Sequence, residues 1–145
     1  MNATAAGKVP AHLWIIGALS LVWNLFGACD YTLTEMRNPW YMSQFPPELI
    51  AVLDGFPAWA IAAWAIGVWA SLAGAVLLLL RSRHAAIAFV ISFLGAAVSF
   101  AYQARLELPA SVDTTANRIM PIIVVVLIVA QWWYARLQTK AGVLR

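Results

Sequence analysis

The sequence predicts an all-α integral membrane protein, a four-helix bundle with up-down-up-down connections. Of its 145 residues, 63% are hydrophobic and only 10% are charged, and the mean hydropathy is +0.80. A chain with so few charges cannot cover the surface of a water-soluble globule. Four apolar runs are also long enough to cross a hydrocarbon core of about 30 Å as helices. We therefore expect one transmembrane domain over residues 1–145, with no soluble domain.

Each of the four apolar runs is expected to be a helix, because lipid offers the backbone no hydrogen-bond partners. A run of about 18 residues is sufficient at a rise of 1.5 Å per residue. The connections are short, so consecutive helices should be antiparallel neighbours. The spans are predicted at about residues 13–33, 56–80, 85–104 and 119–137.

The distribution of Lys and Arg predicts that both ends of the chain are cytoplasmic. Six of the nine Lys and Arg residues lie at the two ends of the chain or in the second loop, and such residues are enriched on the cytoplasmic side of membrane proteins. The net charge of +3 is thus an orientation signal. No basic stripe suited to nucleic acid is present, and the expected partner is the lipid bilayer. The six cations are Lys8, Arg81, Arg83, Arg136, Lys140 and Arg145.

The loop between the first two spans is expected to contain a short helix over residues 48–54. Pro46 and Pro47 can start a helix, and Glu48 suits its first turn. Gly55 and Pro57 then end it. A helix of about two turns should lie flat on the outer surface, where it either covers a pocket as a lid or shields helix ends.

The second span carries a stripe of small residues that predicts close helix packing. Small side chains let backbones approach in lipid, where no hydrophobic force draws helices together. Shorter stripes of the same kind occur in the first and third spans, and the first one places Asn24 in the bundle interior. The fourth span is rich in β-branched residues and should face lipid. The residues of the main stripe are Ala63, Gly67, Ser71 and Ala75.

Polar and aromatic side chains within the spans predict a pocket that opens outward. Polar groups inside a membrane indicate function by default, and an indole N–H at the depth of Trp64, about 12 Å along the helix from Phe56, needs a partner. The alternative is structural: Asn24 bonds across helices, and Asp30 pairs with Arg37 or Arg105 at the membrane surface. The candidate ligand-binding residues are Asn24, Tyr31, Trp64, Tyr102 and Gln103.

The chain lacks the clusters that catalysis or metal binding needs. His12 and His84 lie on different spans with no acid on their side of the membrane, so we expect no enzyme activity, catalytic residue, metal or cofactor. No acidic residue lies near mid-membrane, which disfavours proton-coupled export. Cys29 is the only cysteine, so no intramolecular disulfide forms. A lipoprotein signal ending at Cys29 is an alternative, but Trp23 and Asn24 interrupt its core.

Three segments together resemble a group of small four-span bacterial inner-membrane proteins of uncharacterised function. They are "WNLFGACDYTLT", "FPAWAIAAWAIGVWASLAG" and "LLLLRSR", and the resemblance covers residues 13–103. Some members of that group carry an automatic label of sugar transporter. The resemblance implies a bacterial inner (plasma) membrane location and transport, but it supplies no substrate residues.

Two functions remain. One is permease-like passage of a small neutral solute such as a sugar, and the other is a non-catalytic accessory or structural subunit of a larger membrane complex. Four helices leave little interior once their side chains are packed, so a solute path should lie between two copies. We therefore expect a homo-oligomer or a membrane partner protein.

Overall fold

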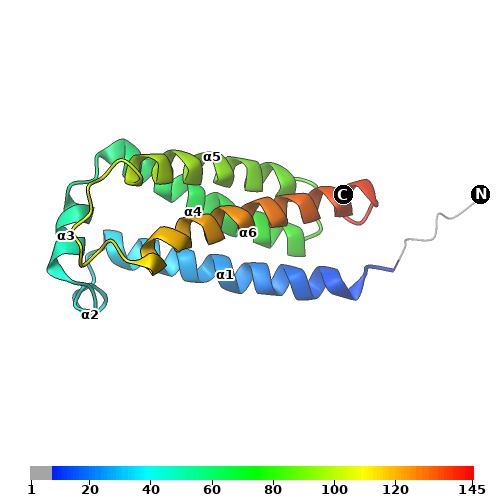
Figure 1. Cartoon of the computed structure of the whole chain (residues 1–145). Helices are drawn as coiled ribbons and strands as arrows, with labels where there is room; N and C mark the ends of the chain where they lie inside the picture. The colour runs from blue at the N-terminus through cyan, green and yellow to red at the C-terminus, as the bar shows by residue number, and fades with distance from the viewer. Residues whose placement is uncertain (1–7) are drawn as a thin grey trace, which may run out of the picture.

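The computed structural model describes residues 8–145 and confirms the predicted four-helix membrane bundle (Figure 1). Four long apolar helices run side by side, and two short helices follow the first of them. The helices are α1 (Ala11–Glu35), α2 (Pro39–Met42), α3 (Pro47–Asp54), α4 (Ala58–Leu79), α5 (Ala85–Gln103) and α6 (Thr115–Lys140).

Local sequence signals account for most helix ends. Pro57 precedes α4, and α3 begins with Pro47 in its first turn. The Thr114 side chain caps α6 by accepting a hydrogen bond of 3.2 Å from the Asn117 backbone N–H. Asn38 caps α2 in the same way, a helix that the sequence analysis did not predict. The helices α1 and α6 extend beyond the predicted spans at both ends, with 25 and 26 residues.

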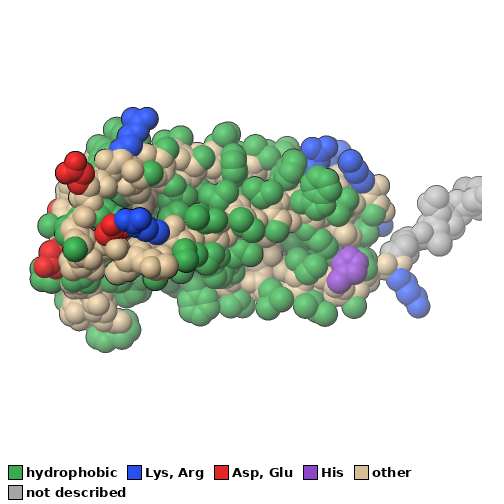
Figure 2. All heavy atoms as spheres, viewed as in Figure 1, with side chains coloured by type: hydrophobic (Ala, Val, Ile, Leu, Met, Phe, Trp, Pro, Cys, Tyr) green, Lys and Arg blue, Asp and Glu red, His purple; other side chains and the backbone are tan. Residues whose placement is uncertain are grey.

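The charged side chains lie at the two ends of the bundle, and the surface between them is apolar (Figure 2). We call the end that carries α2, α3 and residues 104–114 the loop end. The opposite end, where α1 begins and α6 finishes, is the terminal end (Figure 1). Many large hydrophobic side chains between the two ends are exposed, for example Leu19 at 66% and Phe26 at 72%. This distribution is what a lipid-facing surface requires.

The closest packing in the bundle joins α4 to α5. A Cβ atom added at Gly95 would lie 2.6 Å from the backbone nitrogen of Gly67 and 2.7 Å from the backbone oxygen of Ala63. Across the same contact, the Ser92 hydroxyl donates a hydrogen bond of 2.6 Å to the Gly67 carbonyl. Helices in lipid associate through such close packing and interhelical hydrogen bonds. The α4–α5 pair is therefore the centre of the fold.

The other two long helices pack on either side of this pair, α1 against α4 and α6 against α5. The helix α6 is inclined to the other three (Figure 1). Its four buried residues, Ile128, Gln131, Ala135 and Gln138, all lie in its carboxyl-terminal half. The best-packed apolar cluster, which includes Leu13, Leu78, Phe89 and Leu144, lies at the terminal end. The bundle is therefore densely packed at the terminal end and looser at the loop end.

Replacement of Gly95 by Ala should destabilise the protein. The new methyl group would overlap backbone atoms of α4, and overpacking of this kind costs about 1 to 3 kcal/mol. Gly27→Ala is the matched control, because a Cβ atom at Gly27 has nothing within 4 Å. Unfolding of both variants in one detergent provides the measurement. Equal stability of the two variants would mean that α4 and α5 do not meet at Gly95.

Candidate ligand cavity at the loop end

A cavity of about 670 Å³ lies inside the loop-end half of the bundle. Side chains from α1, α4, α5 and α6 form its walls, and Leu49, Val52 and Leu53 of α3 line it at the loop end. The short helix α3 therefore forms the wall of the cavity at the loop end. The volume falls in the range of about 300 to 1,000 Å³ that is usual for small-molecule sites.

The floor of the cavity is a buried polar network centred on Asn24. The Ser71 hydroxyl donates a hydrogen bond to Asn24 Oδ1. Asn24 Nδ2 donates to the Ser20 carbonyl at 2.8 Å and to Gln131 Oε1 at 3.3 Å. The network thus joins α1 to both α4 and α6. Because buried polar groups without partners are costly, each bond helps to hold these three helices together.

The helices α1 and α6 are joined by side chains rather than by close backbone packing. One bond is Asn24–Gln131 at the cavity floor. The second is nearer the terminal end, where the Tyr134 hydroxyl and His12 Nδ1 share a hydrogen bond. Between Ile128 and the loop end, the described part of α6 has no buried residue. The cavity occupies the space that this separation leaves.

Proline contributes to the loose packing of the loop-end half of α6. Pro121 lies inside the helix and lines the cavity. It has no N–H, so the carbonyl of Asn117, four residues earlier, loses its helical donor. Asn117 also lines the cavity. A proline at this position also permits a bend of the helix.

Two polar contacts tie the short helices α2 and α3 to α1. The Tyr41 hydroxyl donates a hydrogen bond to the Asp30 carboxylate, which ties α2 to α1. Arg37 and Asp54 form an ion pair of 2.6 Å, which ties the end of α1 to the end of α3. This ion pair is exposed, so its contribution to stability is small. Burial, and then the hydrogen bond to Asp30, raise the pKa of Tyr41.

The structure places three of the five candidate binding residues on the cavity wall, namely Asn24, Trp64 and Gln103. Tyr31 lies behind the wall, where its ring packs edge-on against Trp64 with centroids 4.9 Å apart. Tyr102 lies apart from the cavity and packs against Phe56 and Trp59. The structure thus brings Asn24, Trp64 and Gln103 together around one space and leaves Tyr102 outside it.

The small-residue stripe of α4 is buried along its length but contacts two neighbours. Ala63 and Gly67 face Gly95 of α5. Ser71 instead bonds to Asn24 of α1. Ala75 is fully buried. A single stripe therefore packs against helices on both sides of α4.

One expectation about an individual contact was wrong. Asp30 pairs with neither Arg37 nor Arg105: it accepts a hydrogen bond from Tyr41 and lines the cavity. Although Asp30 lies about 120° around the helix from Asn24, the chain after α1 folds back over it. The buried side-chain partners of Asn24 are Ser71 and Gln131. A cavity of this size within one chain also differs from the expectation that four packed helices leave little interior.

Gln131 is the important residue that sequence analysis missed. It is buried and accepts the bond from Asn24. A signal was available, because it is an amide within an apolar span, the feature that singled out Asn24. Its position beside Trp132 and Trp133 suggested the membrane interface instead.

Most of the cavity lining is apolar, and Asp30 is its only charged side chain among the residues described. No group of three or more His, Cys, Asp or Glu side chains that could hold a metal occurs within residues 8–145. The arrangement can enclose a small uncharged molecule, offer it hydrogen bonds at the floor and contact it through aromatic rings.

The fold and the cavity define a class: a multi-pass membrane protein with four candidate spans and an internal cavity at one end. Comparisons with models of protein families, with curated proteins and with solved structures gave no match. The function is therefore argued from the cavity itself.

Asn24→Ala should destabilise the ligand-free protein by about 1 to 3 kcal/mol, because Ser71 and Gln131 would lose a buried partner. Gln103→Ala is the control. That amide lines the same cavity but bonds only within its own helix, to Ser99. In nanodiscs, the melting temperature of Asn24→Ala should be well below that of Gln103→Ala. The reverse order would contradict the interhelical role of Asn24.

Tyr41 should ionise at higher pH than a free tyrosine, because its pKa is raised. A group whose pKa is higher in the folded state than in the unfolded state stabilises the fold below its unfolded value, about 10 for Tyr. That contribution is lost as the pH rises through the folded value. The ultraviolet titration difference between wild type and Tyr41→Phe isolates this phenol. A midpoint at or below pH 10 would mean that the Tyr41–Asp30 bond does not form.

Proposed function

We propose that this protein binds a small neutral solute in the loop-end cavity and passes it across the membrane. The observation that carries the proposal is the cavity itself, an apolar chamber of about 670 Å³ with a hydrogen-bonding floor. Pockets that are mostly apolar with a few placed polar groups are typical of small-molecule sites. A sugar is one solute of this kind, since aromatic faces and amides suit its apolar and hydroxyl surfaces.

The charge of the lining argues against an anionic solute. No cationic side chain lines the cavity within the described chain, and the one carboxylate, Asp30, is engaged by Tyr41. An anion would therefore meet no compensating charge, and burying an unpaired charge is costly. A neutral molecule with hydroxyl or amide groups avoids that cost and can bond to Asn24 or Gln103.

Passage needs a second opening at the terminal end, and the seam between α1 and α6 is the candidate gate. In the observed state this seam is closed by Asn24–Gln131 and His12–Tyr134. Two side-chain hydrogen bonds break more readily than the close backbone packing between α4 and α5. A tilt of α6 about Pro121 would open the seam, because proline is a common site of helix bending.

Filling the cavity should abolish binding and passage without unfolding the protein. Gly27 lies on the cavity wall with open space around its Cα, so Gly27→Phe places a ring inside the cavity. Ala18→Phe is the matched control on the same helix, because Ala18 is exposed and lies away from the cavity. Uptake of radiolabelled glucose, maltose and glycerol into proteoliposomes measures the effect.

We expect Gly27→Phe to lose uptake at least tenfold at unchanged thermal stability, and Ala18→Phe to resemble wild type. Uptake that is absent in wild type for all three solutes, or equal in the two variants, would contradict the proposal. Asn24→Ala is unsuitable for this test because it also weakens the fold.

A second candidate is an accessory subunit, favoured by the exposed loop-end half of α6. Ile119, Met120 and Ile122 are all 45% exposed or more beside the cavity, so a helix from a partner or a second copy could pack there. Cross-linking in native membranes from Ile122→Cys in a Cys29→Ser background, followed by purification in mild detergent, separates the cases. A stoichiometric partner together with absent uptake would favour the accessory role.

A further inference from the structure

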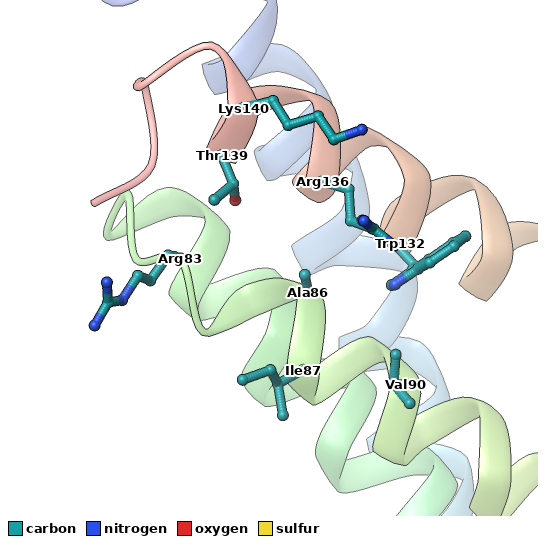
Figure 3. A pocket seen from close by; sticks show the side chains of 8 residues that line it. All are labelled: Arg83, Ala86, Ile87, Val90, Trp132, Arg136, Thr139 and Lys140. Atoms are coloured by element: carbon teal, nitrogen blue, oxygen red, sulfur yellow. The ribbon is translucent and has the colours of Figure 1, made fainter.

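A second hollow lies at the opposite end of the molecule, on the surface between α5 and α6 (Figure 3). Its volume is about 330 Å³. We call it the terminal-end groove. It is separate from the loop-end cavity and shares no residue with it. The residues that line it are Arg83, Ala86, Ile87, Val90, Trp132, Arg136, Thr139 and Lys140.

The groove has a cationic rim and an apolar floor. Arg83 precedes α5, whereas Arg136 and Lys140 follow one another at a spacing of four on α6. On the α5 side, Ile87 and Val90 lie deeper in the span and are 58% and 42% exposed. From Arg83 to Val90 the distance along the helix is about 10 Å at 1.5 Å per residue. The lining therefore changes from charged to apolar with depth, as a phospholipid does from its headgroup to its acyl chains.

Within residues 8–145, no acidic side chain forms an ion pair with a cation of the rim. All six acidic residues are among those described, and the ion pairs formed are Arg37–Asp54 and Arg118–Asp113, both at the loop end. Arg136 lies over the Trp132 ring, 5.3 Å from its centroid, which holds the guanidinium beside the groove. Figure 3 shows Arg83 turned outward, so its exposed side chain is free to turn toward a ligand.

The backbone around Arg83 is fixed by the end of the chain. The Arg83 N–H donates a hydrogen bond of 3.0 Å to the backbone oxygen of Arg145, and the Arg145 N–H donates one of 2.8 Å to the Arg81 carbonyl. Leu144 is buried in the apolar cluster between these contacts. The rim is thus built on a fixed loop, and only its side chains need to move.

We propose that the terminal-end groove binds one anionic phospholipid of the bilayer, with its phosphate among Arg83, Arg136 and Lys140 and an acyl chain along Ile87 and Val90. Charge complementarity argues for this occupant, since three cations without partners meet a phosphate on the membrane surface. The apolar floor argues against a free anion, which would leave that surface unused. Basic pockets between transmembrane helices are known to hold anionic headgroups. This proposal is independent of the function of the loop-end cavity.

The test is native mass spectrometry of the full chain with phosphatidylglycerol and phosphatidylcholine of identical acyl chains. Wild type should retain phosphatidylglycerol preferentially. Arg136→Gln should weaken its binding about fivefold, the value expected for one cation near a membrane surface. Lys8→Gln is the matched control, because Lys8 is an exposed cation near the same end that does not line the groove. Its effect should be less than twofold.

Two further measurements decide whether the ligand is a lipid. Ile87→Ser with Val90→Ser keeps every cation and should still weaken phosphatidylglycerol binding at least threefold, with unchanged thermal stability. Soluble glycerol phosphate at millimolar concentration should not displace the lipid. Displacement by glycerol phosphate would show a free-anion site, and equal losses in Arg136→Gln and Lys8→Gln would show non-specific attraction. Either result overturns the proposal.

Discussion

The backbone contact between Gly67 and Gly95 is the constraint on which the rest of the structure depends. It brings α4 and α5 closer than any side chain would allow, and in lipid such contacts replace the hydrophobic force that packs soluble helices. Around the joined α4–α5 pair, α1 packs beside α4 and α6 packs beside α5. The two outer helices then face each other across a gap that side chains must bridge.

The bridging residues explain why the two halves of the bundle differ. Asn24 reaches both Ser71 and Gln131 near the middle of the membrane, and the terminal-end side of this network is filled by large apolar residues such as Leu13 and Phe89. On the loop-end side, α6 carries Pro121 and has no buried residue before Ile128, which leaves space within the described structure. The same buried network thus joins α1 to α4 and α6 and forms the floor of the cavity.

The carboxyl-terminal half of α6 takes part in both features for which we propose ligands. Gln131 faces inward and closes the cavity floor, while its neighbour Trp132 lines the terminal-end groove. A lipid in the groove would therefore contact the same helical turn that closes the cavity. The two ends also differ in charge, with acids confined to the loop end and uncompensated cations at the terminal end. The uncompensated cations suit an anionic lipid at the terminal end.

The sequence by itself determined the four spans, their approximate ends and the short helix α3, because hydrophobic length, proline and capping residues act locally. It also predicted that Asn24 points inward. Only the tertiary structure decided which helix each polar group meets. Gln131 as the partner of Asn24, Tyr41 as the partner of Asp30, and Gly95 as the point of closest approach all join residues far apart in the chain. Helical spacing gives the face on which a residue lies but not the neighbour across from it, since that depends on the tilt and order of the packed helices.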